Sequence, residues 1–360
     1  MRAALLRKMG DDALEVRDDI ELVDVGAGEV KVAIKATGVC HSDLSCMNGT
    51  IPQPAPAVLG HEGAGVISEV GEGVTDVKVG DHVIIAWSPP CGECAFCGPR
   101  HQPNLCSNIQ MVMGGTPHFR LDSTPVFGMA GAGTFAEEMI IPHQGVVKID
   151  DDIPLEIGSL VGCGVMTGVG AALNTAKVQP GSSVIVYGCG GVGISCIQGA
   201  KVAGASVIVA VDLNDGKLED AVRLGATHAC KPDEVDALKA SLTGGDGFDY
   251  SFEAIGLPTT MRASYDAIRR GGTACIVGVG KLDEMVSFSA FELFFSEKTL
   301  VGSYYGSADV RVDFHKMLDH WKAGRLDLEG MISRRIKLDE INDAFAAMQR
   351  GEVIRQVISF

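Results

Sequence analysis

Residues 184–193 read VIVYGCGGVG, an apolar and mostly β-branched run that ends in a glycine-rich turn. Gly188, Gly190 and Gly193 give the spacing G-x-G-x-x-G between this predicted strand and the helix predicted from ISCIQGAKVAGA. Glycines allow close approach of a pyrophosphate, and the N–H groups that open the helix face that anion. The motif alone is weak evidence, but its position between strand and helix favours a dinucleotide-binding unit.

Asp212 ends the next predicted strand, SVIVAVD, nineteen residues after Gly193. A carboxylate at this place can accept hydrogen bonds from the ribose hydroxyls of adenosine and would repel a 2′-phosphate. The sequence therefore predicts NAD rather than NADP. The alternative is a glycine turn that serves only tight helix-to-strand packing, and an acidic residue in this register disfavours it.

The chain on either side of the glycine turn predicts two domains. From about residue 165 onward, apolar strands alternate with helical segments such as DGKLEDAVRLGA and a helix near residues 260–270, which is typical of a parallel sheet covered by helices. Residues 1–150 instead contain short β-branched strands between Gly, Pro and Asp turns. A chain of 360 residues also exceeds the usual size of a single core.

Composition excludes several classes of protein. The net charge is −16, and Lys and Arg are scattered, which argues against a nucleic-acid partner or an anionic membrane surface. The segment MRAALLRKMGDDALEVRDD has too few apolar residues for a signal peptide. Apolar stretches such as residues 160–173 are short and interrupted by glycine, so we expect no membrane span and a cytoplasmic location.

Eleven cysteines without an export signal indicate metal binding or catalysis rather than disulfides. Residues 91–106, CGECAFCGPRHQPNLC, place four of them in one loop: Cys91, Cys94, Cys97 and Cys106. Tetrahedral zinc is the simplest ligand, while an iron–sulfur cluster is disfavoured because a ferredoxin run brings its fourth Cys, with Pro, sooner. Four thiolates leave no open coordination position, so this site is predicted to be structural.

A second ligand set comes from three separate pieces of the chain. Cys40 lies in GVCHSD, His61 in GHEGAG and Cys163 in VGCGVMTG. Two thiolates and a neutral imidazole balance the charge of Zn²⁺ and leave a fourth position for water or an alcohol oxygen, a set known from alcohol dehydrogenases.

These motifs and the terminal EVIRQVISF occur in an order that resembles the zinc-dependent medium-chain alcohol dehydrogenase family over nearly the whole chain. The resemblance implies an α/β fold with a GroES-like, mostly-β catalytic domain from residues 1–164 and 304–360, including a structural zinc lobe at about 88–110. It also implies a Rossmann domain, a doubly wound parallel sheet that binds NAD, from residues 165–303.

The resemblance also assigns roles to individual residues. Cys40, His61 and Cys163 are similar to the catalytic zinc ligands, Asp43 to the partner of His61, Ser42 to the proton acceptor and Glu62 to a residue behind the zinc that assists ligand exchange. The implied coenzyme contacts are His41, Thr167, Gly188, Gly190, Gly191, Val192, Gly193, Asp212, Lys217, Val277, Val279 and Arg355. The implied substrate pocket contains Trp87 and Ile51, with Met111 and Met113 as further candidates, although Trp87 could equally be a core indole.

The activity implied is hydride transfer between a primary alcohol or aldehyde and NAD, with two zinc ions per chain. A formaldehyde dehydrogenase that acts on a thiol adduct is the alternative, and a non-enzymatic relative is disfavoured because all zinc ligands are present. Two departures from the family pattern are the eight-residue spacing before Cys106 and Ser45, where many members have a His that relays the proton. The apolar stretch VSFSAFELFF suggests a homodimer or homotetramer.

Overall fold

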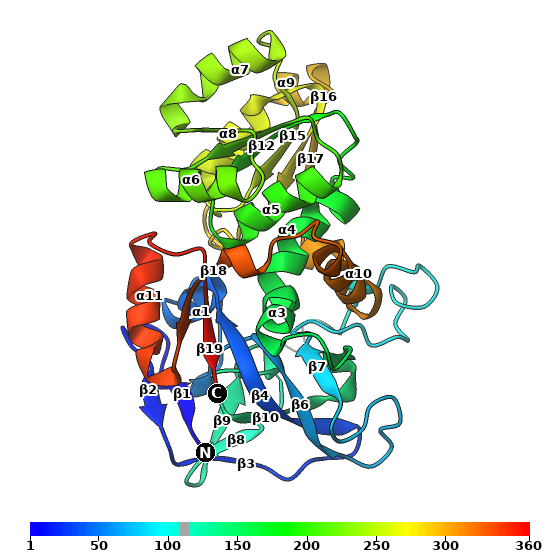
Figure 1. The fold of residues 1–360 in the computed structure, drawn as a ribbon, viewed down its shortest axis with the longest axis vertical. Helices are drawn as coiled ribbons and strands as arrows, with labels where there is room; N and C mark the ends of the chain where they lie inside the picture. The colour runs from blue at the N-terminus through cyan, green and yellow to red at the C-terminus, as the bar shows by residue number, and fades with distance from the viewer. Residues whose placement is uncertain (109–114) are drawn as a thin grey trace.

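The computed structural model describes residues 1–108 and 115–360. Figure 1 shows two lobes joined by a column of helix, α3 (Leu155–Leu160) and α4 (Met166–Gly170), with both chain termini in the lower lobe. The upper lobe holds the α/β part of the chain, and the lower lobe is mostly β. The fold class expected from the sequence is confirmed.

The upper lobe contains a six-stranded sheet in the order β14-β13-β12-β15-β16-β17, with every neighbouring pair parallel. This is the strand order of a Rossmann fold, in which the order reverses beside the first strand. The strands are β12 (Ser183–Tyr187), β13 (Val207–Val211), β14 (His228–Cys230), β15 (Phe248–Glu253), β16 (Ile268–Ile276) and β17 (Thr299–Gly302).

The sheet is buried on both faces because its side chains alternate between two apolar clusters. Val184 and Val186 of β12 belong to one cluster, while Ile185 and Tyr187 belong to the other. The helices of this lobe are α5 (Gly191–Val202), α6 (Asp215–Arg223), α7 (Val235–Thr243), α8 (Pro258–Ala267) and α9 (Ala290–Phe295). The helix expected near residues 260–270 is α8, which ends earlier because the chain from Ile268 already belongs to β16.

The lower lobe is assembled from both ends of the chain. Its larger sheet has the order β11-β7-β6-β4-β19-β18, with β10 also paired to β4, and the C-terminal β19 runs antiparallel to β4 with Gln356 opposite Val39. The strands are β4 (Glu29–Val39), β6 (Glu62–Val70), β7 (His82–Ile85), β10 (Glu138–Pro142), β11 (Val146–Lys148), β18 (Ile332–Ile336) and β19 (Arg355–Ser359).

A second sheet closes the lower lobe in the order β2-β1-β5-β9-β8-β3. Its strands are β1 (Ala3–Leu6), β2 (Glu15–Arg17), β3 (Ile20–Leu22), β5 (Ala57–Val58), β8 (Phe119–Leu121) and β9 (Thr124–Gly128). The helices of this lobe that lie outside the column are α1 (His41–Met47), α10 (Val310–Lys322) and α11 (Ile341–Gln349). Short 3₁₀ turns occupy Pro103–Leu105, Met129–Gly131, His143–Gly145, Pro232–Glu234, Tyr305–Ser307, Glu329–Met331 and Leu338–Glu340.

The column between the lobes is one helix, Leu155–Thr175, in which π-turns at Val161–Val165 and Ala171–Thr175 interrupt the α-helical hydrogen bonding. Among the described residues it is the one helix long and apolar enough to cross a membrane, and 83% of its apolar window is buried, as in a core helix. The predicted apolar stretch, residues 160–173, lies within this helix, and its glycines do not end it. They let it pack closely instead, since a Cβ on Gly168 would lie 2.3 Å from the carbonyl oxygen of Val192.

The predicted boundary between residues 164 and 165 falls inside this helix. The parallel sheet itself lies between Ser183 and Gly302, within the predicted range 165–303. The domain limits therefore stay a prediction.

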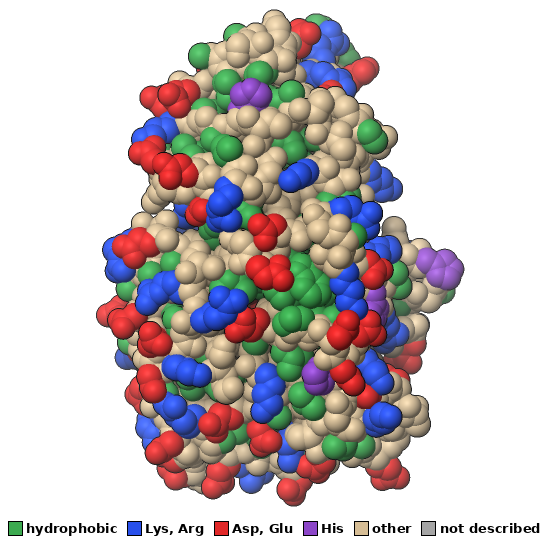
Figure 2. Space-filling model, viewed as in Figure 1, with side chains coloured by type: hydrophobic (Ala, Val, Ile, Leu, Met, Phe, Trp, Pro, Cys, Tyr) green, Lys and Arg blue, Asp and Glu red, His purple; other side chains and the backbone are tan. Residues whose placement is uncertain are grey.

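Figure 2 shows acidic and basic side chains interspersed over the visible face, without a continuous basic area.

Candidate active site

The three expected metal ligands meet between the two lobes from distant parts of the chain. Cys40 follows β4 and caps α1, His61 precedes β6, and Cys163 lies in the first π-turn of the long helix. Together with Glu62, they offer ligand atoms that all lie within 4.8 Å of one another. The cluster is buried, with exposed fractions of 4% for Cys40, 2% for His61 and 6% for Cys163.

Asp43 sets the orientation of the His61 ring. Nδ1 of His61 lies 2.9 Å from the Asp43 carboxylate, which also accepts hydrogen bonds from the backbone N–H groups of Cys40 at 2.8 Å and Gly60 at 3.2 Å. Because Nδ1 donates to a carboxylate, the lone pair of the neutral ring is on Nε2. That atom is buried and has no hydrogen-bond partner among the described residues, as expected of a metal ligand. The donor set therefore fits a zinc ion.

Burial by itself would lower the pKa of His61, but the Asp43 carboxylate and the Cys40 sulfur together outweigh it and raise this pKa well above the ordinary value. A bound cation would compete with that proton, so metal loading and protonation of His61 exclude each other. The same carboxylate thus orients the ring and increases its basicity as a ligand.

Glu62 and Arg355 form an ion pair directly behind the cluster. Both side chains are buried, with exposed fractions of 0% for the glutamate and 4% for the arginine. The second carboxylate oxygen of Glu62 accepts a hydrogen bond from the N–H of Gly164 at 3.2 Å. Burial raises the pKa of Glu62 to about 7, against the opposing effect of the Arg355 charge.

Arg355 also reaches the glycine loop. A Cβ on Gly191 would lie 2.4 Å from its Cδ atom, and a Cβ on Gly164 would lie 2.8 Å from its guanidinium nitrogen. The guanidinium therefore lies between the metal cluster and the loop that is expected to hold a pyrophosphate. Its contact with coenzyme phosphate stays a prediction.

The glycine loop has the backbone geometry that close approach requires. Gly188 has a φ of +91°, and a Cβ on Gly193 would lie only 1.7 Å from the carbonyl oxygen of Gly188. A Cβ on Gly190 would meet nothing within 4 Å, so this side of the loop is open. Asp212 supports the loop, since its carboxylate accepts the N–H groups of Cys189 at 2.8 Å and Asn214 at 3.0 Å. Each oxygen keeps a second lone pair for a ribose hydroxyl.

The other residues expected to contact coenzyme surround this loop or the metal cluster. Thr167 is half-buried on α4, one helical turn beyond Cys163. Val277 is 9% exposed and Val279 is 57% exposed, on the segment that follows β16. His41 is exposed at the start of α1. Lys217 lies on α6, where its charge opposes the burial that raises the pKa of Cys189.

The structure describes three of the residues expected on the substrate side of the cluster: Ser42, Trp87 and Ile51. The Ser42 hydroxyl lies 3.7 Å from the Cys40 sulfur. The Trp87 ring lies edge-on to the His61 ring, with centroids 6.1 Å apart, while Trp87 and the half-buried Ile51 both pack against the apolar core of the lower lobe. The candidates Met111 and Met113 lie outside the described residues.

Two residues that motif reasoning missed stand out in the structure. Glu253 ends β15 with no exposed surface, and its Oε1 accepts hydrogen bonds from Ile255, Gly256 and Thr260, which fixes the turn at the sheet's switch point. A charged residue at the end of a buried strand could have signalled it. Tyr304 packs on Trp87 with a centroid distance of 5.6 Å and belongs to no recognisable motif.

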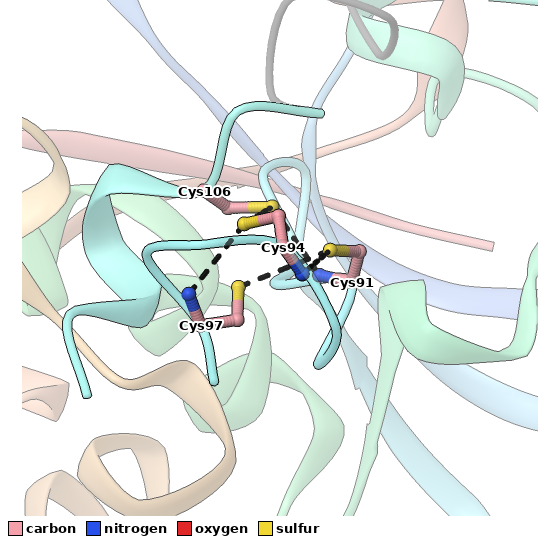
Figure 3. Close-up of side chains that lie close together, drawn as sticks. All are labelled: Cys91, Cys94, Cys97 and Cys106. Carbon is pink, nitrogen blue, oxygen red and sulfur yellow. Dashed lines mark hydrogen bonds between the residues drawn. The ribbon is translucent and has the colours of Figure 1, made fainter. Parts of the chain in front are cut away.

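The four-cysteine loop is preorganised for a second ion (Figure 3). The sulfurs of Cys91 and Cys97 are 4.0 Å apart, and those of Cys94 and Cys106 are 3.9 Å apart. A tetrahedron with Zn–S bonds of about 2.3 Å has S···S edges of about 3.8 Å, so these spacings suit zinc. Hydrogen bonds from the Ser107 side chain and nearby backbone N–H groups lower the pKa of Cys94 to about 5, which favours the thiolate.

Comparison with known proteins agrees with this geometry. Residues 26–151 match the family model of the alcohol dehydrogenase GroES-like domain, and residues 191–323 match that of the zinc-binding dehydrogenases. The chain therefore belongs to the zinc-binding medium-chain alcohol dehydrogenase family. It is a zinc-dependent dehydrogenase with two candidate zinc sites, and membership of the family implies small-molecule substrates.

Three relatives illustrate the similarity. The class-3 alcohol dehydrogenase of Cereibacter sphaeroides is 39% identical over 97% of this chain and 98% of its own. The S-(hydroxymethyl)glutathione dehydrogenase of Paracoccus denitrificans is 38% identical over 97% of this chain and 98% of its own. The crystal structure of benzyl alcohol dehydrogenase from Acinetobacter calcoaceticus has a TM-score of 0.90 and 32% identity, and the match covers 100% of this chain and 99% of that one.

Substitutions in the two cysteine clusters should affect different properties: stability for the four-cysteine loop and catalysis for the buried cluster. We expect two zinc ions per chain in the wild type and one in either Cys94→Ser or Cys163→Ser. Cys94→Ser should lower the thermal midpoint markedly, because a structural zinc contributes folding free energy directly, whereas Cys163→Ser should stay folded. Metal analysis by mass spectrometry and thermal unfolding measure both quantities.

Cys46→Ala is the matched control, because Cys46 is a buried thiol outside both clusters and should leave two zinc ions bound. One metal ion in the wild type, or iron with labile sulfide, would contradict the assignment.

Proposed function

We propose that this protein is an NAD-dependent alcohol dehydrogenase that interconverts primary alcohols and aldehydes. The observation that carries the proposal is the convergence of Cys40, His61 and Cys163 around an orphaned Nε2 atom, next to a glycine loop of the dinucleotide-binding type. Three protein ligands leave a fourth coordination position for substrate, as a catalytic zinc site requires.

When bound, zinc would supply Lewis-acid polarisation of the substrate oxygen, and NAD would supply the hydride acceptor. The chain's own residues would accept the substrate proton and hold the metal ligands in position. We assign the role of proton acceptor to Ser42, whose hydroxyl lies 3.7 Å from the Cys40 sulfur. Asp43 fixes the tautomer of His61, and the buried Glu62–Arg355 pair fixes the floor of the site.

An imidazole relay at position 45 is not available for release of that proton to water, because this residue is Ser45. Ser45 is only 8% exposed, and its carbonyl oxygen accepts the N–H of Ile51. A serine hydroxyl does not titrate near neutral pH as an imidazole would. We infer that the proton passes from Ser42 to water without a titrating side chain at position 45.

A second candidate function is oxidation of the glutathione adduct of formaldehyde. The printed names of the relatives support it, since one at 38% identity is an S-(hydroxymethyl)glutathione dehydrogenase. The metal chemistry would be the same, and only the region around the substrate would differ. A requirement for thiol in the assay distinguishes the two activities.

We also propose that the protein is a homodimer or homotetramer in the cytoplasm. The short helix α9 exposes apolar rings, with exposed fractions of 66% for Phe291, 74% for Phe294 and 51% for Phe295. Beside it, β17 forms the edge of the six-stranded sheet, where unpaired backbone groups can accept another strand. All eleven cysteines are free, which fits a reducing compartment.

Alcohol oxidation without added thiol tests the proposed function. The zinc-loaded protein should reduce NAD with ethanol, hexan-1-ol or benzyl alcohol, and Cys163→Ser should lower kcat/KM at least about 100-fold, since a metal Lewis acid is worth several kcal/mol. The assay follows NADH formation by absorbance. Activity with formaldehyde only when glutathione is present would favour the second candidate, and no NAD reduction with any substrate would reject both.

Asp212→Gly should weaken NAD binding about 10- to 150-fold, because hydrogen bonds to a charged group are worth about 1.5–3 kcal/mol. The ratio of kcat/KM values for NAD and NADP should fall, since the repulsion of a 2′-phosphate is lost. Asp215→Ala is the control, as this neighbouring carboxylate is exposed and pairs with Lys231. A wild type that prefers NADP would contradict the role of Asp212.

Phe294→Glu should disrupt the proposed subunit contact, because a charge would be buried against apolar rings of the second copy. Sedimentation velocity should give at least twice 37.7 kDa for the wild type and a smaller species for the variant. Val79→Glu, also exposed at 58% but on the lower lobe, should leave the mass unchanged. A monomeric wild type would overturn the proposal.

A further inference from the structure

Three aromatic rings form a wall beside the metal cluster, here called the aromatic wall: Trp87, Tyr304 and Tyr305. Trp87 packs on Tyr305 with a centroid distance of 4.5 Å and on Tyr304 at 5.6 Å and an interplanar angle of 73°. The far edge of Trp87 faces the His61 ring at 6.1 Å. The wall therefore leads from a metal ligand toward the protein surface.

The wall is held in place from behind. The Tyr305 hydroxyl donates a hydrogen bond to the carbonyl of Gly162, the residue before the ligand Cys163, and the ring is buried. The backbone of Tyr305 has a φ of 52°, a conformation that non-glycine residues keep only where the surroundings enforce it. The Tyr304 hydroxyl lies 3.2 Å from the hydroxyl of Ser88, which fixes the second ring.

The outer part of the wall is not covered. Tyr304 is 42% exposed and Trp87 is half-buried, in contrast to the 5% exposure of Tyr305. A core indole normally donates its N–H to a partner, but Nε1 of Trp87 has none among the described residues. Trp87 is thus held by apolar packing without a hydrogen bond from its indole N–H, and the exposed ring of Tyr304 next to it is available to a ligand.

We propose that Tyr304, together with Trp87, is a specificity-determining residue that selects primary alcohols with a flat aromatic side chain, of which benzyl alcohol is the simplest. The inference rests on the proposed function, because it assumes that the substrate oxygen lies at the metal cluster. A planar ring attached to the reacting carbon would pack edge-to-face or offset on the wall, as the protein rings already do on one another.

The same wall disfavours a glutathione adduct. Such a substrate brings two carboxylates, which bind well only where cationic side chains or N–H groups face them. The groups that form the wall are rings and hydroxyls without charge.

The test is the ratio of kcat/KM for benzyl alcohol to that for hexan-1-ol in the wild type, Tyr304→Leu and Tyr304→Phe. Leucine keeps apolar volume but removes the ring, so the ratio should fall about 2- to 12-fold, the worth of one aromatic pair. Phenylalanine keeps the ring and loses only the bond to Ser88, so the ratio should stay within about twofold of the wild type.

Binding gives a readout that does not depend on turnover. The chain has two tryptophans, so Trp321→Phe leaves Trp87 as the only indole. Benzyl alcohol should quench its fluorescence in the zinc-loaded protein, hexan-1-ol should not, and Tyr304→Leu should weaken the benzyl alcohol titration by a similar 2- to 12-fold factor.

The outcomes separate this inference from the proposed function. Alcohol oxidation with equal or better efficiency for hexan-1-ol, or an unchanged ratio in Tyr304→Leu, overturns the role of Tyr304 and leaves the proposed function intact. If no alcohol is oxidised at all, the proposed function fails. The fluorescence titration then still tests the aromatic wall. If Tyr304→Leu does not weaken the response to benzyl alcohol, the wall is rejected as a ligand surface.

Discussion

The ion pair between Glu62 and Arg355 is the contact on which the rest of the site depends. Both charges are fully removed from water, so either one alone would destabilise the fold strongly, and they must be brought together. Glu62 opens β6 and Arg355 opens the C-terminal β19, while the guanidinium packs against Gly191 at the start of α5. One buried pair thus joins the mostly-β lobe, the chain's last strand and the glycine loop.

The long helix between the lobes supplies the second constraint. Its glycines permit close contacts that a side chain would hinder, such as Gly168 against the backbone of Val192 in α5 and Gly164 against the Arg355 guanidinium. Cys163 therefore stays at a fixed distance from the coenzyme loop, since both belong to one closely packed helix pair. Hydride transfer needs reacting atoms held within a near-attack distance, and this packing is the physical means of holding them.

The two candidate metal clusters differ in ligand charge and in whether a substrate can reach the ion. The four-cysteine lobe would enclose a metal ion completely, whereas the buried cluster offers three protein ligands and a side bordered by Ser42 and the aromatic wall. A metal site of this kind does not by itself select the substrate, so the side chains around it must contribute to that choice. The proposed contribution comes from Tyr304 and Trp87.

The sequence by itself determined the features that depend on local spacing. The four-cysteine run, the glycine turn after β12 and the carboxylate of Asp212 were predictable, because loop wrapping and strand-to-helix turns involve neighbours in the chain. The tertiary structure decided the features that join distant segments. Glu62 and Arg355 are 293 residues apart, and Tyr304 meets Ser88 across 216. No periodicity encodes such pairs, since only folding brings their side chains together. The close packing of the long helix could not be predicted for the same reason, because it depends on the neighbours that lie against its glycines.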